Sequence, residues 1–152
     1  MVDAMLGSLA RKLRIFGFDA VYFRHGPDSR LLAVAEAEGR VVLTSDRGLA
    51  ASADRRGISA LLIEGRSDRD RLASLEGWAR KNSVVLTPSI SRCALCNVPL
   101  LSLRRADVAE EVPIGVSRRH IVFFRCPQCN KLYWKGGHWK KLTRLAVVLQ
   151  SE

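Results

Sequence analysis

The first 88 residues alternate between helix-like and strand-like spacing of apolar positions. Between Leu6 and Phe16 apolar residues recur every three or four positions and Gly17 follows as a stop, which predicts an amphipathic helix. Asp28 is placed to cap a second helix that Gly39 ends. The same reasoning predicts helices over 49–56 and 68–82, and strands over 18–23, 41–44, 58–63 and 83–87.

The first strand is confined to Met1 and Val2, so either that strand is very short or the true start of the chain lies upstream. Strands that alternate with helices of this length predict right-handed βαβ units. We therefore expect an α/β fold, in which a parallel sheet of four or five strands is covered by helices on both faces.

The character of the chain changes after residues 87–89, where cysteines appear, helical periodicity fades and prolines divide the chain into short pieces. Residues 120–126 and 131–134 have the pattern of two hairpin strands, and 139–150 that of a closing helix. We predict one domain over 1–88 and a second, smaller domain over 89–152.

Positive charge is concentrated in the second part. The formal net charge is +10; residues 1–88 hold 14 Lys and Arg against 11 Asp and Glu, and residues 89–152 hold 11 against 4. This charge predicts a polyanionic partner, although basic residues that only solubilise the surface, or suit a hot or acidic habitat, are an alternative. No apolar run is long enough to cross a bilayer, and Asp3 occupies the place of a basic signal region, so we expect a cytoplasmic protein.

All four cysteines fall into two pairs, Cys93 with Cys96 and Cys126 with Cys129, with 29 residues between the pairs. Two such knuckles place four thiolates around Zn²⁺ and leave no open position, as in a structural site. Disulfides are less attractive in a cytoplasmic chain. His138 is another possible ligand, but four cysteines already fill the coordination sphere. We predict a small zinc ribbon whose fold depends on Zn²⁺.

Basic and aromatic residues are interleaved around the second cysteine pair. Basic side chains hold phosphates, and exposed rings stack on unpaired bases, so this pattern favours RNA as a partner. Packing beneath the ribbon is the alternative for about half of the aromatic residues. The residues predicted to contact RNA are Arg118, Arg119, Lys135, His138, Trp139, Lys140 and Lys141 here, and Arg11, Lys12 and Arg14 on the basic face of the first helix.

Acidic residues follow the predicted strands. Asp3 comes after the first strand, Asp28 lies in the loop after the second, and Asp46 follows the third. The carboxyl ends of parallel strands share one edge, where ligands bind in α/β folds, and like charges gathered there need a cation. Oxygen ligands of this kind suit Mg²⁺ or Mn²⁺. Each aspartate also has the alternative role of a helix N-cap.

Four separated motifs, in order, carry a family resemblance: "DAMLGSLARKLRIFGFDAVYF", "PDSRLLAVAEAEGRVVLTSD", "SRCALCNVPL" and "FFRCPQCNKLYWKGGHW". Together they resemble the Mut7-C ribonuclease family, in which a PIN-like nuclease domain carries a zinc ribbon. The resemblance spans nearly the whole chain. It implies a PIN-like Rossmannoid fold and metal-dependent cleavage of RNA.

The resemblance also implies roles for particular residues. The metal-binding positions are Asp3, Asp28 and Asp46, and Thr44 and Ser45 belong to a hydroxyl-bearing segment that orients Asp46. Sites of this type commonly hold a fourth acid, for which Glu64 is the positional candidate.

The leading functional hypothesis is a metal-dependent ribonuclease, with Mg²⁺ or Mn²⁺ at the acidic edge and a zinc ribbon that grips RNA. A non-catalytic RNA-binding or ribosome-associated adaptor is the main alternative, and one component of a toxin–antitoxin pair is another. The oligomeric state stays open.

Overall fold

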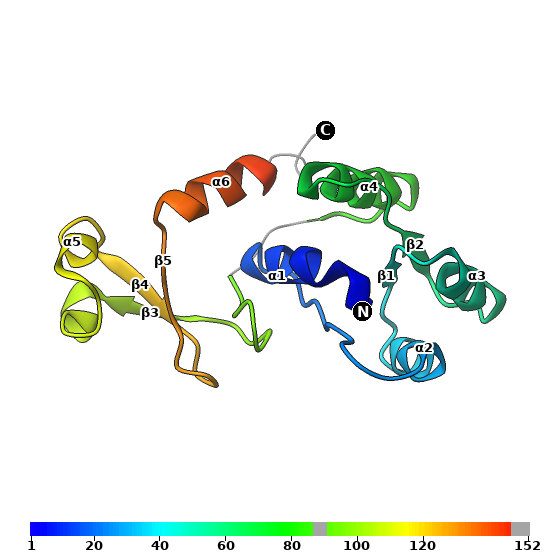
Figure 1. Cartoon of the computed structure of the whole chain (residues 1–152), viewed down its shortest axis with the longest axis horizontal. Helices are drawn as coiled ribbons and strands as arrows, with labels where there is room; N and C mark the ends of the chain where they lie inside the picture. The colour runs from blue at the N-terminus through cyan, green and yellow to red at the C-terminus, as the bar shows by residue number, and fades with distance from the viewer. Residues whose placement is uncertain (87–90, 147–152) are drawn as a thin grey trace.

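The computed structural model describes residues 1–86 and 91–146, which form a layered α/β part and a small antiparallel sheet (Figure 1). The helices of the first part are η1 (Ala4–Leu6), α1 (Gly7–Ile15), α2 (Asp28–Ala37), α3 (Arg47–Arg55) and α4 (Asp68–Lys81), and its strands are β1 (Val42–Thr44) and β2 (Ala60–Leu62). The second part contains β3 (Leu101–Arg104), η2 (Arg105–Val108), α5 (Ile114–Ser117), β4 (Val122–Arg125), β5 (Leu132–Trp134) and α6 (Gly137–Ala146).

The predicted parallel arrangement is confirmed for a small sheet. β1 pairs with β2 in parallel, and Val2 makes single parallel bridges to Tyr22 on one side and Leu43 on the other. The amide of Val2 donates to the carbonyl of Val21 at 2.7 Å, and that of Asp3 to the carbonyl of Leu43 at 2.9 Å. Four segments thus run side by side, with the one around Val2 between Tyr22 and β1.

Two predicted strands differ from the structure. The strand expected over 18–23 is reduced to the bridge at Tyr22. The strand expected over 83–87 is wrong for residues 84–86, which pair with no strand among the described residues, while 87 lies outside them. Val85 is 85% exposed, so its β-branched side chain is not packed in a sheet.

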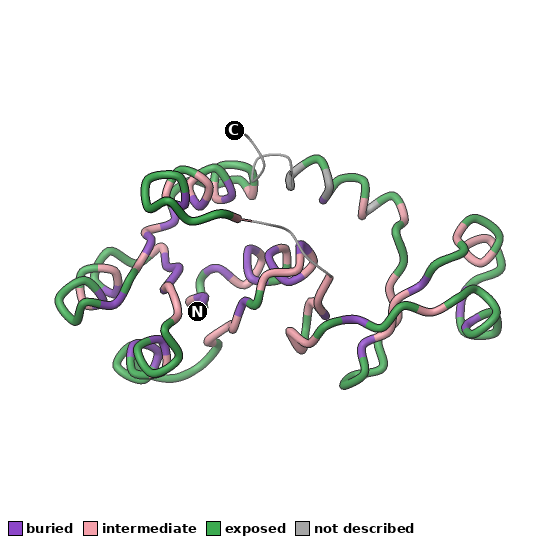
Figure 2. The backbone as a smooth tube through the Cα atoms, turned by 180° about the vertical axis from the view of Figure 1, so that it is seen from behind, coloured by how far each residue is buried: buried purple, intermediate pink, exposed green. Residues whose placement is uncertain are grey.

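Helices cover both faces of the parallel sheet, as expected (Figure 1). Leu43 packs into a core with residues of α1 and α4, whereas the preceding Val42 packs with residues of α2 and α3. This alternation follows from the two-residue period of a strand, which sends neighbouring side chains to opposite faces. Figure 2 shows buried positions on the inner side of these helices and exposed positions on the outer side.

Local capping explains where the helices begin and end. Ser67 accepts a hydrogen bond from the Asp70 amide, and the Asp70 carboxylate accepts one from the Ser67 amide, so a capping box starts α4. The chain leaves α2 through Gly39, which has a φ of +60° and therefore a conformation that favours glycine. These signals are local, which is why the sequence predicts the helices closely.

The second part is built on an antiparallel sheet of order β3-β4-β5. The predicted hairpin is confirmed as β4 and β5, and β3 is an additional strand that pairs with β4. The predicted closing helix begins at Gly137, and its residues 147–150 lie outside the described residues, as does the expected boundary at 88 and 89. Leu142 of α6 joins the core formed by α1 and α4, so the end of the second part packs on the first.

Candidate active site and metal centre

The carboxyl edge of the parallel sheet carries Asp3 and Asp46 on neighbouring segments. Asp3 follows Val2, which bridges to β1, and Asp46 lies two residues beyond the end of β1. Asp3 is half-buried and Asp46 is exposed. The two carboxylates therefore belong to the edge at which α/β sheets bind their ligands.

Thr44 connects these two aspartates. Its hydroxyl group donates to Oδ2 of Asp3 at 2.8 Å and accepts a hydrogen bond from the backbone amide of Asp46 at 2.9 Å. The side chain of Thr44 is fully buried, which fixes the hydroxyl group in place. One buried oxygen atom thus holds the carboxylate of Asp3 and the backbone of Asp46.

Asp46 is also the N-cap of α3. Its Oδ1 accepts hydrogen bonds from the amides of Gly48 at 2.6 Å and Leu49 at 3.2 Å. The N-cap role is therefore confirmed for Asp46, and it leaves Oδ2 of this residue, like Oδ1 of Asp3, without a hydrogen-bond partner in the described part of the chain. Each aspartate has one oxygen held by the protein and one available to a ligand.

Asp28 lies apart from this arrangement. It is exposed, it is the first residue of α2 after the N-cap Pro27, and it does not act as the cap. The carboxylate oxygens of Asp3, Asp28 and Asp46 are not all within 4.8 Å of one another, because among the described residues only the cysteines form such a group. Asp3 and Asp46 are therefore linked through Thr44, and Asp28 does not complete a close group of three with them.

The other residues predicted at this edge point elsewhere. The Ser45 hydroxyl group contacts the Met5 sulfur at 3.7 Å rather than Asp46. Glu64 follows Ile63, whose amide donates to the Thr44 carbonyl, but its exposed carboxylate forms a 3.7 Å ion pair with Arg47. Thr44 is thus the hydroxyl-bearing residue that positions Asp46.

The four cysteines form one cluster, with all four Sγ atoms within 4.8 Å of one another. The Sγ atoms of Cys93 and Cys129 are 3.7 Å apart. A tetrahedral zinc ion with Zn–S bonds of about 2.3 Å holds its sulfur ligands about 3.8 Å apart, so the cluster fits this ion. The cysteine spacing predicted this site, and the cluster could hold zinc.

Hydrogen bonds within each knuckle prepare the sulfur atoms for a cation. The amides of Cys96 and Cys129 donate to the Sγ atoms of Cys93 and Cys126, each at 3.4 Å. Burial opposes ionisation of Cys93, but hydrogen bonds from the Tyr133 hydroxyl group and from nearby amides lower the pKa of this thiol to about 6. The hydrogen bond with Cys129, together with burial, raises the pKa of Cys96 to about 12. The sulfur atoms thus oppose ionisation of one another, and four thiolates at this spacing would require a bound cation.

Both knuckles end in the same backbone conformation, which the spacing of the cysteines alone does not reveal. Asn97 and Asn130 directly follow the second cysteine of each pair and have φ values of 66° and 60°. Asparagine tolerates this left-handed region better than most residues. The shared Cys-x-x-Cys-Asn sequence is the signal that could have predicted it.

Arg14 fastens the first knuckle to α1. Its guanidinium group donates to the carbonyls of Ala94 at 3.0 Å and Leu95 at 2.9 Å, and also to that of Ala20 at 2.8 Å. The residue is only 7% exposed. The prediction that Arg14 lies on an exposed, RNA-binding face of the first helix is therefore wrong, because carbonyls about 80 residues away take its charge into the interior.

Asn97 adds further hydrogen bonds to this polar seam, the set of contacts between the first knuckle and the α/β part. Its side chain accepts a hydrogen bond from the Ala20 amide at 3.2 Å and donates one to the Asp19 carboxylate at 2.6 Å. The amide of Arg92 donates to the Arg14 carbonyl at 2.8 Å. The cysteine cluster and the α/β part are thus joined by directed polar contacts as well as by apolar packing.

The remaining predicted RNA contacts divide by exposure. Arg11 is exposed, whereas Lys12 forms a 2.9 Å ion pair with Asp68 and keeps 16% of its side chain exposed. Of the basic residues predicted to contact RNA in the second part, Arg118, Arg119, Lys135, Lys140 and Lys141 are exposed. The side chain of His138 lies outside the described residues.

Aromatic rings accompany these cations on the ribbon. The ammonium group of Lys135 lies 5.8 Å from the ring centre of Phe124 and 5.3 Å from that of Trp139. Trp139 is half-buried, and Trp134 is 37% exposed. The second part therefore presents basic groups beside aromatic rings.

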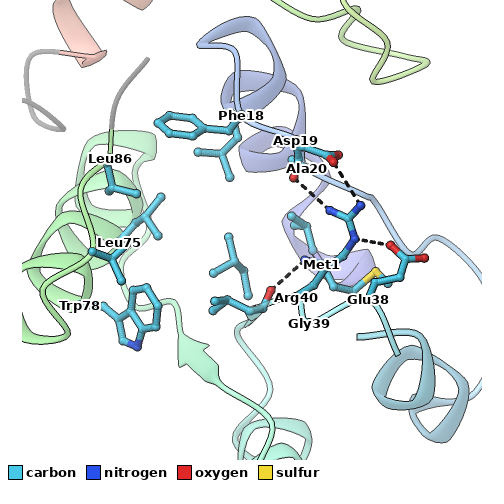
Figure 3. A pocket seen from close by; sticks show the side chains of 15 residues that line it. Met1, Phe18, Asp19, Ala20, Glu38, Gly39, Arg40, Leu75, Trp78 and Leu86 are labelled. Carbon is cyan, nitrogen blue, oxygen red and sulfur yellow. Dashed lines mark hydrogen bonds and ion pairs between the residues drawn. The ribbon is translucent and has the colours of Figure 1, made fainter. Parts of the chain in front are cut away.

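A cavity of about 450 Å³ lies at the opposite edge of the sheet (Figure 3). Phe18, Leu75, Trp78 and Leu86 line it, together with Arg40, which is ion-paired with Asp19 and Glu38. This cavity contains neither Asp3 nor Asp46. This cavity and the acidic edge are therefore separate features.

Among known proteins, one family model matches the chain. The model of the Mut7-C RNAse domain matches residues 1–146, which include both the acidic edge and the cysteine cluster. No curated protein and no solved structure matches the chain. None of the described helices is both long and apolar enough to span a membrane. Because the family model covers nearly the whole sequence, the chain belongs to the Mut7-C RNAse domain family.

Proposed function

We propose that this protein is a metal-dependent ribonuclease whose α/β part, a PIN-like nuclease domain, cuts RNA and whose zinc ribbon holds it. Membership of an RNAse-domain family indicates ribonuclease activity in general and RNA as the substrate. The metal dependence, the catalytic residues and the role of the ribbon are our proposal. The observation that carries it is the Asp3–Thr44–Asp46 arrangement at the carboxyl edge of the sheet.

The two linked aspartates suit Mg²⁺ or Mn²⁺. Mg²⁺ in proteins is often held by only one or two carboxylates, several waters and the phosphate oxygens of the substrate. Asp3 and Asp46 each keep one oxygen atom free of protein partners within residues 1–86 and 91–146. Two carboxylates match a site that is completed by waters and substrate, with Asp28 and Glu64 proposed as outer acids.

In this proposal the residues of the chain position the reaction. The buried Thr44 hydroxyl group fixes the carboxylate of Asp3 and the backbone of Asp46, while the carboxylate of Asp46 is held at the start of α3. A divalent ion held by Asp3 and Asp46 would lower the pKa of a bound water and neutralise charge on the phosphodiester. No side-chain nucleophile is then required, and the cysteines remain structural.

Anomalous scattering from crystals grown with Mn²⁺ tests this site directly. We expect a peak within about 2.2 Å of a carboxylate oxygen of Asp3 and of Asp46, in crystals that also contain a short, uncleaved RNA analogue. The same measurement on the Asp3→Asn variant should show no peak. Density for Mn²⁺ only at other carboxylates, or at none, would refute the proposed metal site.

The ribbon provides the proposed RNA-binding surface. Lys140 and Lys141 are exposed on α6, close in sequence to the Lys135 and Trp139 pair. Exposed lysines bind phosphates largely through charge, and each phosphate contact on single strands contributes about 0.7 to the slope of log affinity against log salt concentration.

Replacement of Lys140 and Lys141 by alanine should therefore weaken binding of single-stranded RNA and flatten this slope by up to about 1.4. Fluorescence anisotropy at several salt concentrations measures both quantities. The matched control is alanine at Arg55 and Arg56, an equal loss of charge on α3 and just beyond it, at the opposite end of the molecule (Figure 1). An equal effect of both pairs would mean that binding does not depend on the ribbon.

A further inference from the structure

A second, smaller cavity lies at the seam between α1, the segment around Tyr22 and the first cysteine knuckle. Its volume is about 200 Å³, below the roughly 300–1,000 Å³ of pockets that enclose whole drug-sized ligands. Arg11, Arg14, Tyr22 and Arg24 line it together with small and apolar residues, and no acidic residue does. Its size and charge suit a small anionic group.

Two of the three arginines are available to such a group. Arg14 is occupied by the carbonyls of the first knuckle, as described above. Arg11 and Arg24 are exposed, and neither has a carboxylate partner among the described residues. Guanidinium groups present several N–H donors in a planar fork that matches the oxygens of a phosphate. An unpaired pair of them in a cavity is therefore a ready phosphate site.

The cavity adjoins the acidic edge. Tyr22 contacts the residues on both sides of Asp3. It bridges to Val2, and its hydroxyl group donates to the Ala4 carbonyl at 2.8 Å. Arg24 follows two residues later, at the carboxyl end of the same segment. Arg24 therefore stands on the segment that pairs with the one carrying Asp3.

Gly7 keeps this wall of the cavity in shape. A Cβ atom at Gly7 would lie 2.7 Å from the Tyr22 hydroxyl oxygen and 2.9 Å from Cζ. Any side chain would displace the ring and its hydrogen bond to the Ala4 carbonyl, so glycine is needed for close approach here. The knuckle supplies the opposite wall through Ala94 and Leu95, which Arg14 holds in place.

From this geometry we infer that the cavity binds a phosphate group of the RNA substrate next to the phosphodiester that is cut, through Arg11 and Arg24. The inference rests on the proposed function and extends it. It gives the cysteine cluster a second role, since the knuckle builds one wall of the site that sets the register of the RNA strand. The phosphate is either an internal one or the 5′-terminal one of a short strand.

Glutamine at both Arg11 and Arg24 tests the inference. With a fluorescent ten-nucleotide RNA and no added divalent ion, we expect this variant to bind at least about tenfold more weakly. The salt slope should fall by about 0.7, the contribution of one phosphate on a single strand. Glutamine at Arg55 and Arg56, which end α3 and do not line the cavity, removes the same charge and should change affinity less than about twofold.

Two strands of equal sequence, one with a 5′-phosphate and one with a 5′-hydroxyl group, identify the source of the phosphate. A preference for the phosphorylated strand that disappears in the Arg11 and Arg24 variant indicates the terminal phosphate, and equal binding of both strands with an equal loss in the variant indicates an internal one. Equal losses for the two glutamine pairs, an unchanged salt slope, or no measurable RNA binding by the unmodified protein would overturn the inference.

Cleavage assayed separately with Mg²⁺ or Mn²⁺ distinguishes this result from a failure of the proposed function. If RNA is cut but the Arg11 and Arg24 variant binds like the control pair, only the phosphate site is wrong. If the variant loses affinity as expected but the unmodified protein cuts no RNA, the phosphate site stands and the nuclease proposal fails.

Discussion

Asparagine at Asp3 or at Asp46 is expected to reduce RNA cleavage by at least about 100-fold while the protein stays folded, as when one preorganised group is removed from a transition-state site. The amide oxygen of asparagine at position 3 can still accept the Thr44 hydrogen bond, and asparagine caps a helix about as well as aspartate. Each variant thus removes one negative charge and little else. Initial rates with Mg²⁺ or Mn²⁺, beside thermal unfolding, measure the effect.

Three further variants sharpen this test. Asp54→Asn, an exposed residue of α3 with no ion pair among the described residues, is the matched control and should cut RNA at the unmodified rate. The double variant of Asp3 and Asp46 should lose little more than either single variant, because both would hold the same ion. Asp28→Asn should have a smaller effect, since among the described residues Asp28 has no hydrogen bond to Thr44 and forms no close group of three with Asp3 and Asp46.

Binding and cleavage should separate in the Asp46→Asn variant. The loss of one negative charge at the edge leaves RNA affinity equal or slightly higher, because it reduces repulsion of the phosphates. A variant that binds RNA and does not cut it supports catalysis, whereas an unmodified protein that binds and never cuts supports the adaptor hypothesis. Activity in both asparagine variants close to that of Asp54→Asn would contradict our assignment of Asp3 and Asp46.

Local signals in the sequence predicted the helices and the knuckles. The spacing from Leu6 to Phe16 predicted α1, and the serine before Asp68 starts α4 through a capping box. Paired cysteines in two short loops predicted the cluster, because the geometry of each knuckle lies within a few residues. In each case the decisive contacts are between residues close together in the chain.

The errors concern residues whose partners are distant in sequence. Arg14 follows Arg11 and Lys12 at helical spacing, as expected of a basic face. Its guanidinium group is instead buried against carbonyls of the first knuckle, and nothing near Arg14 in the sequence predicts this burial. Residues 84–86 have strand-like composition, yet they pair with no strand among the described residues. The pairing of Asp3 with Asp46 through Thr44 was predicted only as far as a shared sheet edge, since the order of the segments fixes which acids become neighbours.

Cys126→Ser is expected to remove stoichiometric zinc and to unfold β3, β4 and β5. Binding of structural zinc by four such ligands contributes on the order of 10–16 kcal/mol in small zinc domains, as much as the whole stability of a typical domain. The apolar clusters of this sheet are small, so little else holds it together. Elemental analysis measures the zinc, and hydrogen exchange measures the protection of the β4 amides. Gln128→Ser, in the same knuckle and exposed, should keep both.

The polar seam between α1 and the first knuckle predicts a second effect of zinc loss, on the hydrogen-exchange protection of α1. When the knuckle unfolds, Arg14 loses the carbonyls of Ala94 and Leu95, so α1 should lose protection while α2 and α3, on the far face of the sheet, keep theirs. Arg14→Met should weaken this coupling but retain zinc, because no cysteine ligand changes. Zinc-free protein with full protection of β4 would show that the cluster does not hold the ribbon together, and loss of protection confined to β3, β4 and β5 would show that the seam transmits nothing to α1.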